Sequence, residues 1–256
     1  MAFSVLLLGH VITDYLLQPE VLVRAKRLSS RRLFFQPYTL IHVMIFLAVT
    51  LILGAVEAIL DWRFVLATLS VTILHYFIDY WKNLKKQQTA AIFLLDFLFH
   101  IISIVVTCYA SGLWDMPASW DALISAVKTS TLPINQLTQV NYLVIFFVLL
   151  IWGTGNFVSF VVAAKGPPRS PESLEKAAKV SRRNAHIGYM ERLLILLFIL
   201  QEAYIAIVLL LLFKALVRFE QLKDRDYAEY FIYGSMLSFT CGMLFATLYR
   251  YFYLYL

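Results

Sequence analysis

Four of the five histidines lie in the first hundred residues, and each stands in a stretch of mainly apolar side chains. Three of them have an aspartate four residues away: His10 with Asp14, His75 with Asp79 and, in reverse order, Asp96 with His100. A spacing of four places both side chains on one face of an α-helix, one turn apart. The pattern therefore predicts three helices that each present an imidazole and a carboxylate at the same point.

Imidazole nitrogens and carboxylate oxygens without thiolates are the ligand set of Zn²⁺, Mn²⁺ or Fe²⁺. An aspartate can bind the ion directly or orient a histidine through its second ring nitrogen, and the sequence leaves both roles open. Seven residues, enough for one or two ions, are the candidate metal ligands, and the three aspartates among them are also the candidate catalytic bases: His10, Asp14, His42, His75, Asp79, Asp96 and His100. Gln18 extends the polar stripe of His10 and Asp14.

Apolar stretches of about 20 residues, long enough to cross a hydrocarbon core as helices, recur along the whole chain. Of its 256 residues 61% are hydrophobic and only 15% are charged, against roughly 25% charged in a soluble domain. We therefore predict an all-α, polytopic transmembrane helical bundle with about seven spans, at residues 2–18, 38–58, 63–81, 91–111, 140–164, 189–217 and 228–253. The first span is short, which favours a tilted or re-entrant helix.

The net charge of +6 is concentrated in alternate connections, between residues 24 and 32, 82 and 86, and 165 and 183. The positive-inside rule then predicts an external N-terminus and a cytoplasmic C-terminus in a bacterial inner membrane. Contact with anionic lipid headgroups explains the basic excess, so membrane lipids are the expected partners and nucleic acid is not. The oligomeric state is left open.

With this orientation, the histidines and aspartates fall at similar depths. At about 1.5 Å per residue, His42 and the pairs of the third and fourth spans lie in the cytoplasmic half of the bilayer, and His10 lies near the middle of its span. An isolated carboxylate there costs about 2.5 to 3.5 kcal/mol, so the aspartates require partners. We expect one polar pocket that opens to the cytoplasm and binds metal. A metal-free polar network, a proton relay and coincidence are the alternatives.

The division predicted for the chain is a four-span module at 1–111 and a three-span module at 112–256, with a basic cytoplasmic loop at 165–187. Within that loop, residues 172–184 can form a short helix. Glu202 falls near the middle of the sixth span and is expected to bind substrate, couple protons or hydrogen bond to a neighbouring helix. Glu191 and Arg192 lie at a cytoplasmic boundary, as an interfacial pair or a phosphate clamp.

The segments LLLGHVITDYLLQP, LHYFIDYWK and LLDFLFH resemble an uncharacterised bacterial inner-membrane family, domain of unknown function 3307, over roughly residues 3–108. The resemblance implies that a family motif recurs at the seven candidate ligands and at Gln18. The helix pattern also looks like that of membrane-bound metal-dependent hydrolases and, more remotely, of the zinc-dependent phospholipase C group. That analogy implies a zinc cluster that cleaves phosphate esters.

These observations favour a metal-dependent hydrolase of phosphoesterase type, acting on a lipid or lipid-linked phosphate ester at the cytoplasmic leaflet. The expected cofactor is a divalent transition metal, zinc first, with manganese or iron as alternatives. The second hypothesis is a metal-ion or proton-coupled transporter, which needs access from both sides, whereas the external half of the first four spans reads as apolar. Glu202 is the residue that could extend a polar path outward. The third hypothesis is a non-enzymatic membrane scaffold.

Overall fold

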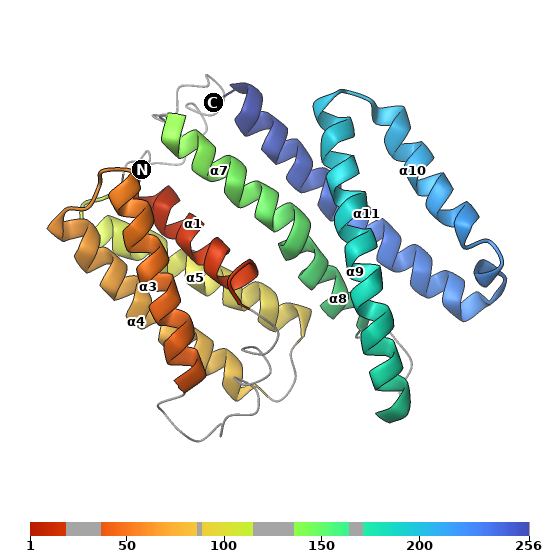
Figure 1. The fold of residues 1–256 in the computed structure, drawn as a ribbon, viewed down its shortest axis with the longest axis horizontal. Coiled ribbons are helices and arrows are strands. Elements are labelled where there is room, and N and C mark those ends of the chain that lie inside the picture. The colour runs from red at the N-terminus through yellow and green to blue at the C-terminus, as the bar shows by residue number, and fades with distance from the viewer. Residues whose placement is uncertain (19–36, 86–88, 115–135, 164–170, 256) are drawn as a thin grey trace. The chain divides into compact units, whose positions relative to one another are not determined.

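The computed structural model describes residues 1–18, 37–85, 89–114, 136–163 and 171–255 (Figure 1). Every regular element within these ranges is a helix, which confirms the predicted all-α class. The basic connection at 24–32 and residues 165–170 of the predicted basic loop lie outside them. The chain forms two compact units, residues 1–145 with 252–256 and residues 146–251, and each unit is described by itself.

Five helical segments are long and apolar enough to cross a membrane: Pro37–Val56, Trp62–Leu84, Ala90–Ala110, Gln136–Val162 and Tyr227–Tyr253. Two shorter apolar helices, Ala2–Tyr15 and Tyr204–Val217, accompany them. Large apolar side chains such as Ile52 and Val56 are exposed on these helices, as expected where a helix faces lipid instead of water. The protein is a helical membrane protein.

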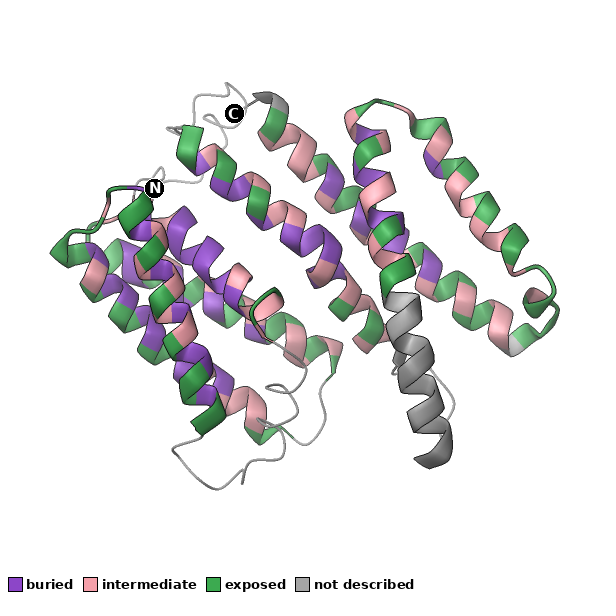
Figure 2. Ribbon diagram, viewed as in Figure 1, coloured by how far each residue is buried: buried purple, intermediate pink, exposed green. Residues whose placement is uncertain are grey.

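Unit 1 is built around α1 (Ala2–Tyr15), in which ten of fourteen residues are buried (Figure 2). It packs against α3 (Pro37–Val56) and α5 (Ala90–Ala110), and α4 (Trp62–Leu84) packs against both of these. Gly9 allows the close approach of α1 to α3, because a Cβ at that position would overlap the Thr50 hydroxyl. The short first span is therefore the central helix of a four-helix group.

Side-chain caps set where α4 and α5 begin. The Asp61 carboxylate accepts a hydrogen bond of 2.7 Å from the Phe64 backbone N–H, and the Thr89 hydroxyl accepts one of 3.3 Å from Ile92 N–H. Such caps satisfy backbone donors that the first turn of a helix leaves free. By setting where each helix begins, the caps help to determine which residues of α4 and α5 face the interior of unit 1.

Most of α7 (Gln136–Val148) belongs to unit 1 and completes it at the end where α1 begins. Asn141 Nδ2 donates to Ser4 Oγ at 3.2 Å and to Glu57 Oε1 at 2.6 Å. Gln139 Nε2 donates to the backbone oxygen of Phe252 at 2.9 Å. The start of α1, the end of α3 and the C-terminal end of α11 (Arg225–Tyr255) therefore lie at the same end of unit 1.

Unit 2 contains a π-helical turn, η1 (Leu149–Gly153), which joins α7 to α8 (Thr154–Ala163). It also contains α9 (Pro171–Leu200), α10 (Tyr204–Val217), η2 (Gln221–Lys223) and most of α11. Its core is a cluster of aliphatic and aromatic side chains that includes Leu150, Ile195 and Phe239.

The predicted sixth span, 189–217, is not one helix. It consists of the end of α9 and all of α10, which pack against each other and run in opposite directions (Figure 1). Glu202 adopts a left-handed φ of 58° in the turn that joins them, so it does not lie in the middle of a helix as predicted. Apolar residues on both sides of Gln201 and Glu202 gave one continuous hydropathy signal, which hid the reversal. Residues 171–187 of the predicted loop are the first turns of α9.

Phe252, near the C-terminal end of α11, lies at the end of unit 1 where α1 begins. The number of membrane crossings and the side of the membrane on which each chain end lies stay predictions.

Candidate metal centre

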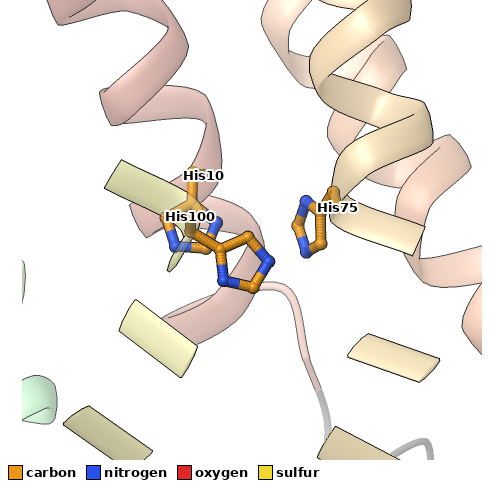
Figure 3. A group of neighbouring side chains, drawn as sticks. All are labelled: His10, His75 and His100. Atoms are coloured by element: carbon orange, nitrogen blue, oxygen red, sulfur yellow. The ribbon is translucent and has the colours of Figure 1, made fainter. Parts of the chain in front are cut away.

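The structure brings all seven candidate ligands together inside unit 1. α1 contributes His10 and Asp14, α3 contributes His42, and the pairs on α4 and α5 face them from the other two helices. Figure 3 shows His10, His75 and His100 converging from α1, α4 and α5. The four histidines are at most 2% exposed, so the cluster is removed from solvent.

The four imidazole rings pack directly against one another. The centroids of His10 and His100 are 4.3 Å apart with nearly parallel planes, and the His75 ring meets His100 edge-on at 4.4 Å. His42 lies 5.1 Å from His75, also edge-on. Neutral rings tolerate this packing, whereas several protonated rings at these separations would repel strongly in a low dielectric.

Asp14 lies at the centre of three of these rings. Its Oδ1 accepts a hydrogen bond of 3.1 Å from His42 Nε2, and lies 3.5 Å from His75 Nε2 and 3.7 Å from His10 Nδ1. One carboxylate oxygen thus faces nitrogens from three helices. The spacing of four residues predicted the approach to His10, and the contacts with His42 and His75 follow from the packing of α1 with α3 and α4.

The other two aspartates close the cluster from the side of α4 and α5. Asp79 Oδ2 lies 3.7 Å from His42 Nε2, and Asp96 Oδ1 lies 3.8 Å from His100 Nδ1. The Asp96 backbone oxygen is 2.8 Å from His100 Nδ1. Since a carbonyl only accepts, Nδ1 carries the proton and the His100 Nε2 lone pair is available to a ligand.

Most of the unsatisfied polar atoms of the described interior belong to this cluster. Eight buried side-chain nitrogen or oxygen atoms lack a hydrogen-bond partner among the described residues, and six of them are His10 Nδ1, His42 Nδ1, both nitrogens of His75, His100 Nε2 and Asp96 Oδ1. Buried polar atoms in native proteins are nearly always satisfied. A concentration of unsatisfied buried nitrogen and oxygen atoms is typical of a site that binds an additional group.

Three sets of residues can each offer ligand atoms within 4.8 Å of one another: His10, His75 and His100; Asp14, His42 and His75; Asp79, Asp96 and His100. Ligand atoms around a tetrahedral zinc ion lie about 3.4 Å apart, given zinc–ligand distances of about 2.0 to 2.2 Å. The ligand atoms of each set would therefore have to move closer together to bind an ion. His75 and His100 each belong to two sets.

Lys82 is a member of the cluster that the sequence analysis assigned to a basic connection. Its Nζ lies 2.5 Å from Asp96 Oδ2, near the C-terminal end of α4. The signal was present in the spacing, because Lys82 follows His75 by seven residues and Asp79 by three and so shares their helix face. Lys82 follows an apolar run, and for this reason it was assigned to the connection after the span.

The remaining predicted residues lie elsewhere. Gln18 follows the end of α1 and is half-buried. Glu191 and Arg192 belong to unit 2 and do not pair as predicted, because adjacent helical residues face different directions. Glu191 accepts from Lys214 Nζ at 2.7 Å, whereas Arg192 donates to the Ile151 carbonyl at 2.7 and 3.1 Å and to Ser238 Oγ at 3.3 Å. Glu202 pairs with Arg250.

Fold and cluster together define a polytopic α-helical membrane protein with a buried, four-helix His/Asp centre. The family model described as "Protein of unknown function (DUF3307)" matches residues 2–131, half of the chain, and the protein belongs to this family. All seven candidate ligands lie inside the matched region. Among curated proteins and solved structures, nothing matches the sequence.

Proposed function

We propose that the His/Asp cluster binds a divalent transition-metal ion, zinc first and manganese or iron as alternatives. The proposed activity is hydrolysis of a lipid or lipid-linked phosphate ester at the cytoplasmic leaflet of a bacterial inner membrane. The observation that carries the proposal is the group of unsatisfied imidazole nitrogens, which converge from four helices. The catalytic residues proposed are Asp14, Asp79 and Asp96.

The energetics favour a bound ion over a metal-free network. A buried polar group without a partner costs about 1 to 3 kcal/mol, so six such atoms are a heavy penalty for one cluster. A network that served only helix packing would pair ring nitrogens with carboxylates. His75, which is fully buried, makes no hydrogen bond to the described residues through either nitrogen, and its nearest carboxylate contact is the 3.5 Å approach of Nε2 to Asp14 Oδ1. A cation that accepts their lone pairs would remove this penalty.

The same arrangement can support hydrolysis. A bound divalent ion would lower the pKa of a coordinated water toward about 7 and supply a nucleophile at neutral pH. A carboxylate that does not bind the ion could accept the proton of that water, and Asp14 is the best placed because it faces three rings. The buried site would bind a substrate that already resides in the membrane.

For the orientation, we propose that the cluster lies toward the cytoplasmic side and that the N-terminus is external. Lys82 and Lys85 at the end of α4 and the basic connections support this, since positive residues favour the cytoplasmic side. The reversal between α9 and α10 leads us to place the C-terminus on the external side too. Anionic membrane lipids are the proposed partners.

An assay of phosphate release tests the activity. Purified protein loaded with zinc would be given phosphatidic acid and a polyprenyl diphosphate in mixed micelles, beside chelator-treated protein. We expect release that chelation abolishes and zinc restores, that Asp79→Asn lowers at least about 100-fold, and that the exposed Glu229→Gln leaves unchanged. Zinc-loaded, folded protein that releases no phosphate from either substrate would exclude hydrolysis of these substrates.

One observation supports the alternative of a transporter. The sequence suggested an apolar external half for the first four spans. In the half of unit 1 that we propose to be external, however, buried hydroxyls continue the polar faces of α3, α4 and α5: Thr50, Thr68, Thr72, Ser103 and Thr107. The buried Glu57 directly follows the C-terminal end of α3, on the side that we propose to be external. These residues, instead of Glu202, could extend a path outward.

Uptake into sealed proteoliposomes distinguishes the two hypotheses. A transporter would move zinc or protons into the vesicles at a rate that Thr50→Val reduces, whereas a hydrolase would leave zinc uptake at the level of empty vesicles. A non-enzymatic scaffold would show neither activity, and histidine substitutions would only destabilise it.

A further inference from the structure

The contact of Lys82 with Asp96 places a cation inside one of the three candidate metal sets. Lys82 Nζ lies 2.5 Å from Asp96 Oδ2, and Asp96 forms a set with Asp79 and His100. The Lys82 side chain is 28% exposed while that of Asp96 is 6% exposed, so the ammonium reaches the set from the edge of the cluster. A divalent ion in this set would meet that ammonium.

Ligand atoms for a second ion are nevertheless present beside the ion pair. Asp96 Oδ1 and His100 Nε2 are buried and have no hydrogen-bond partner among the described residues. The Asp14, His42 and His75 set shares no residue with the Asp79, Asp96 and His100 set. Side chains alone would therefore allow two ions, each with three ligands, and the positive charge of Lys82 is what opposes the second.

Charge balance supports this view. With neutral histidines, the three aspartates carry three negative charges, of which Lys82 neutralises one and a single divalent ion neutralises the other two. Net charge buried in a membrane is expensive unless it is paired. A second divalent ion beside Lys82 would leave two uncompensated positive charges in the cluster.

We propose that the Lys82 ammonium occupies the second cation position of the centre, so that the protein binds one divalent ion in a set that contains His75. Loss of the Lys82 charge opens the Asp79, Asp96 and His100 set and converts the centre into a site for two ions. This inference rests on the proposed metal binding and adds its stoichiometry.

Lys85 provides a matched control, because it lies three residues after Lys82, directly after the C-terminal end of α4. Its Nζ is 4.9 Å from the centroid of the Trp81 ring, and its side chain is exposed. Removal of the Lys85 charge changes the net charge of the protein by the same amount without touching the cluster. Lys82→Arg keeps the charge in place.

The test is the zinc content per chain after loading and desalting, measured by elemental mass spectrometry and by cobalt titration of the d–d absorption bands. We expect about one ion in the wild type, Lys82→Arg and Lys85→Gln, and about two in Lys82→Gln. Lys82→Met, which retains the apolar stem, provides a second variant if Lys82→Gln does not fold.

The outcomes separate this inference from the proposed function. Two ions in the wild type, or a single ion in a folded Lys82→Gln or Lys82→Met variant, would overturn the role of Lys82 while leaving metal binding intact. No ion in the wild type or in any variant would overturn metal binding itself, and the inference with it.

Discussion

His75 combines complete burial with two ring nitrogens that lack hydrogen bonds, and it contacts rings from α1, α3 and α5. It also belongs to two of the three candidate ligand sets. A histidine that serves only packing would be more stable if its ring donated at least one hydrogen bond. A buried polar group without a partner destabilises a protein by more than a typical hydrogen bond stabilises it. His75 is therefore the residue whose chemistry is most difficult to explain without a ligand.

Arg192 carries the clearest stability prediction at the scale of single residues. Its guanidinium donates twice to the Ile151 carbonyl, which lies inside the π-helical turn, and once to Ser238. Gly155 and Gly188 leave room for it, because a Cβ at either position would press on its terminal nitrogens. Arg192→Met should lower the free energy of unfolding by about 1 to 3 kcal/mol, since it leaves a buried acceptor unpaired.

Thermal unfolding in detergent measures this effect. Arg225→Met is the control, because Arg225 is exposed and pairs only with Glu229 among the described residues, in a contact worth at most about 0.5 kcal/mol. Equal melting temperatures for Arg192→Met and the wild type would show that the guanidinium does not stabilise the π-helical turn.

The sequence predicted those contacts of the cluster that depend only on the spacing of residues along a helix. The interval of four residues predicted each histidine beside its aspartate, and the depth of the spans predicted their convergence. Lys82 was missed because a lysine after an apolar run is more often a loop charge. The partner of Arg192 is a carbonyl in a π-helical turn, which has no side-chain signature that could be recognised in the sequence.

Among the elements, α1 determines how closely the ligand-bearing helices approach. This helix, the predicted first span, is too short to cross a bilayer easily, yet neighbouring helices bury most of its length. Hydropathy reports only length and composition, so it could not distinguish a central helix from a tilted or re-entrant one. The packing of Gly9 against Thr50 shows that the helix is central in its group, whereas its tilt and the depth of its crossing stay predictions.

Gly9→Ala should therefore destabilise the protein by about 1 to 3 kcal/mol, because the new methyl group overlaps the Thr50 hydroxyl. Thr50→Ala removes that hydroxyl, so the double variant should recover most of the loss. Unfolding midpoints of the wild type, both single variants and the double variant form a double-mutant cycle. Additive effects in this cycle would contradict direct packing at this point.

The reversal between α9 and α10 shows a second limit of the sequence. Two helices of opposite direction were read as one span because the turn between them contains only three residues. Gln201 and Glu202 were the signal, since polar residues between two apolar runs can form a turn as well as a buried site. The ion pair of Glu202 with Arg250 provides the carboxylate with a partner.

For the whole molecule, the proposed orientation, with separate crossings by α9 and α10, places both chain ends on the external side. A C-terminal alkaline phosphatase fusion should be active and a C-terminal green fluorescent protein fusion should be dark. An epitope inserted after Lys223, between α10 and α11, should be inaccessible from outside in intact cells. A fluorescent C-terminal fusion with an accessible epitope would instead support seven crossings.

The family match covers residues 2–131, so the cluster and its four helices lie within the matched region and most of unit 2 lies outside it. Unit 2 has its own core and its own buried charges, Glu191 with Lys214 and Arg192 with Ile151. We expect substitutions in these pairs to affect stability without affecting metal content.

The most direct test of metal binding is the metal content of protein purified without chelators, measured by elemental mass spectrometry. The wild type should contain about one transition-metal ion per chain, and the His75→Ala, His100→Ala double variant should contain none while it remains folded. His186→Ala, which alters an exposed histidine, should match the wild type. An absence of metal from the wild type, even after incubation with zinc, would contradict the proposed centre and favour a metal-free polar network.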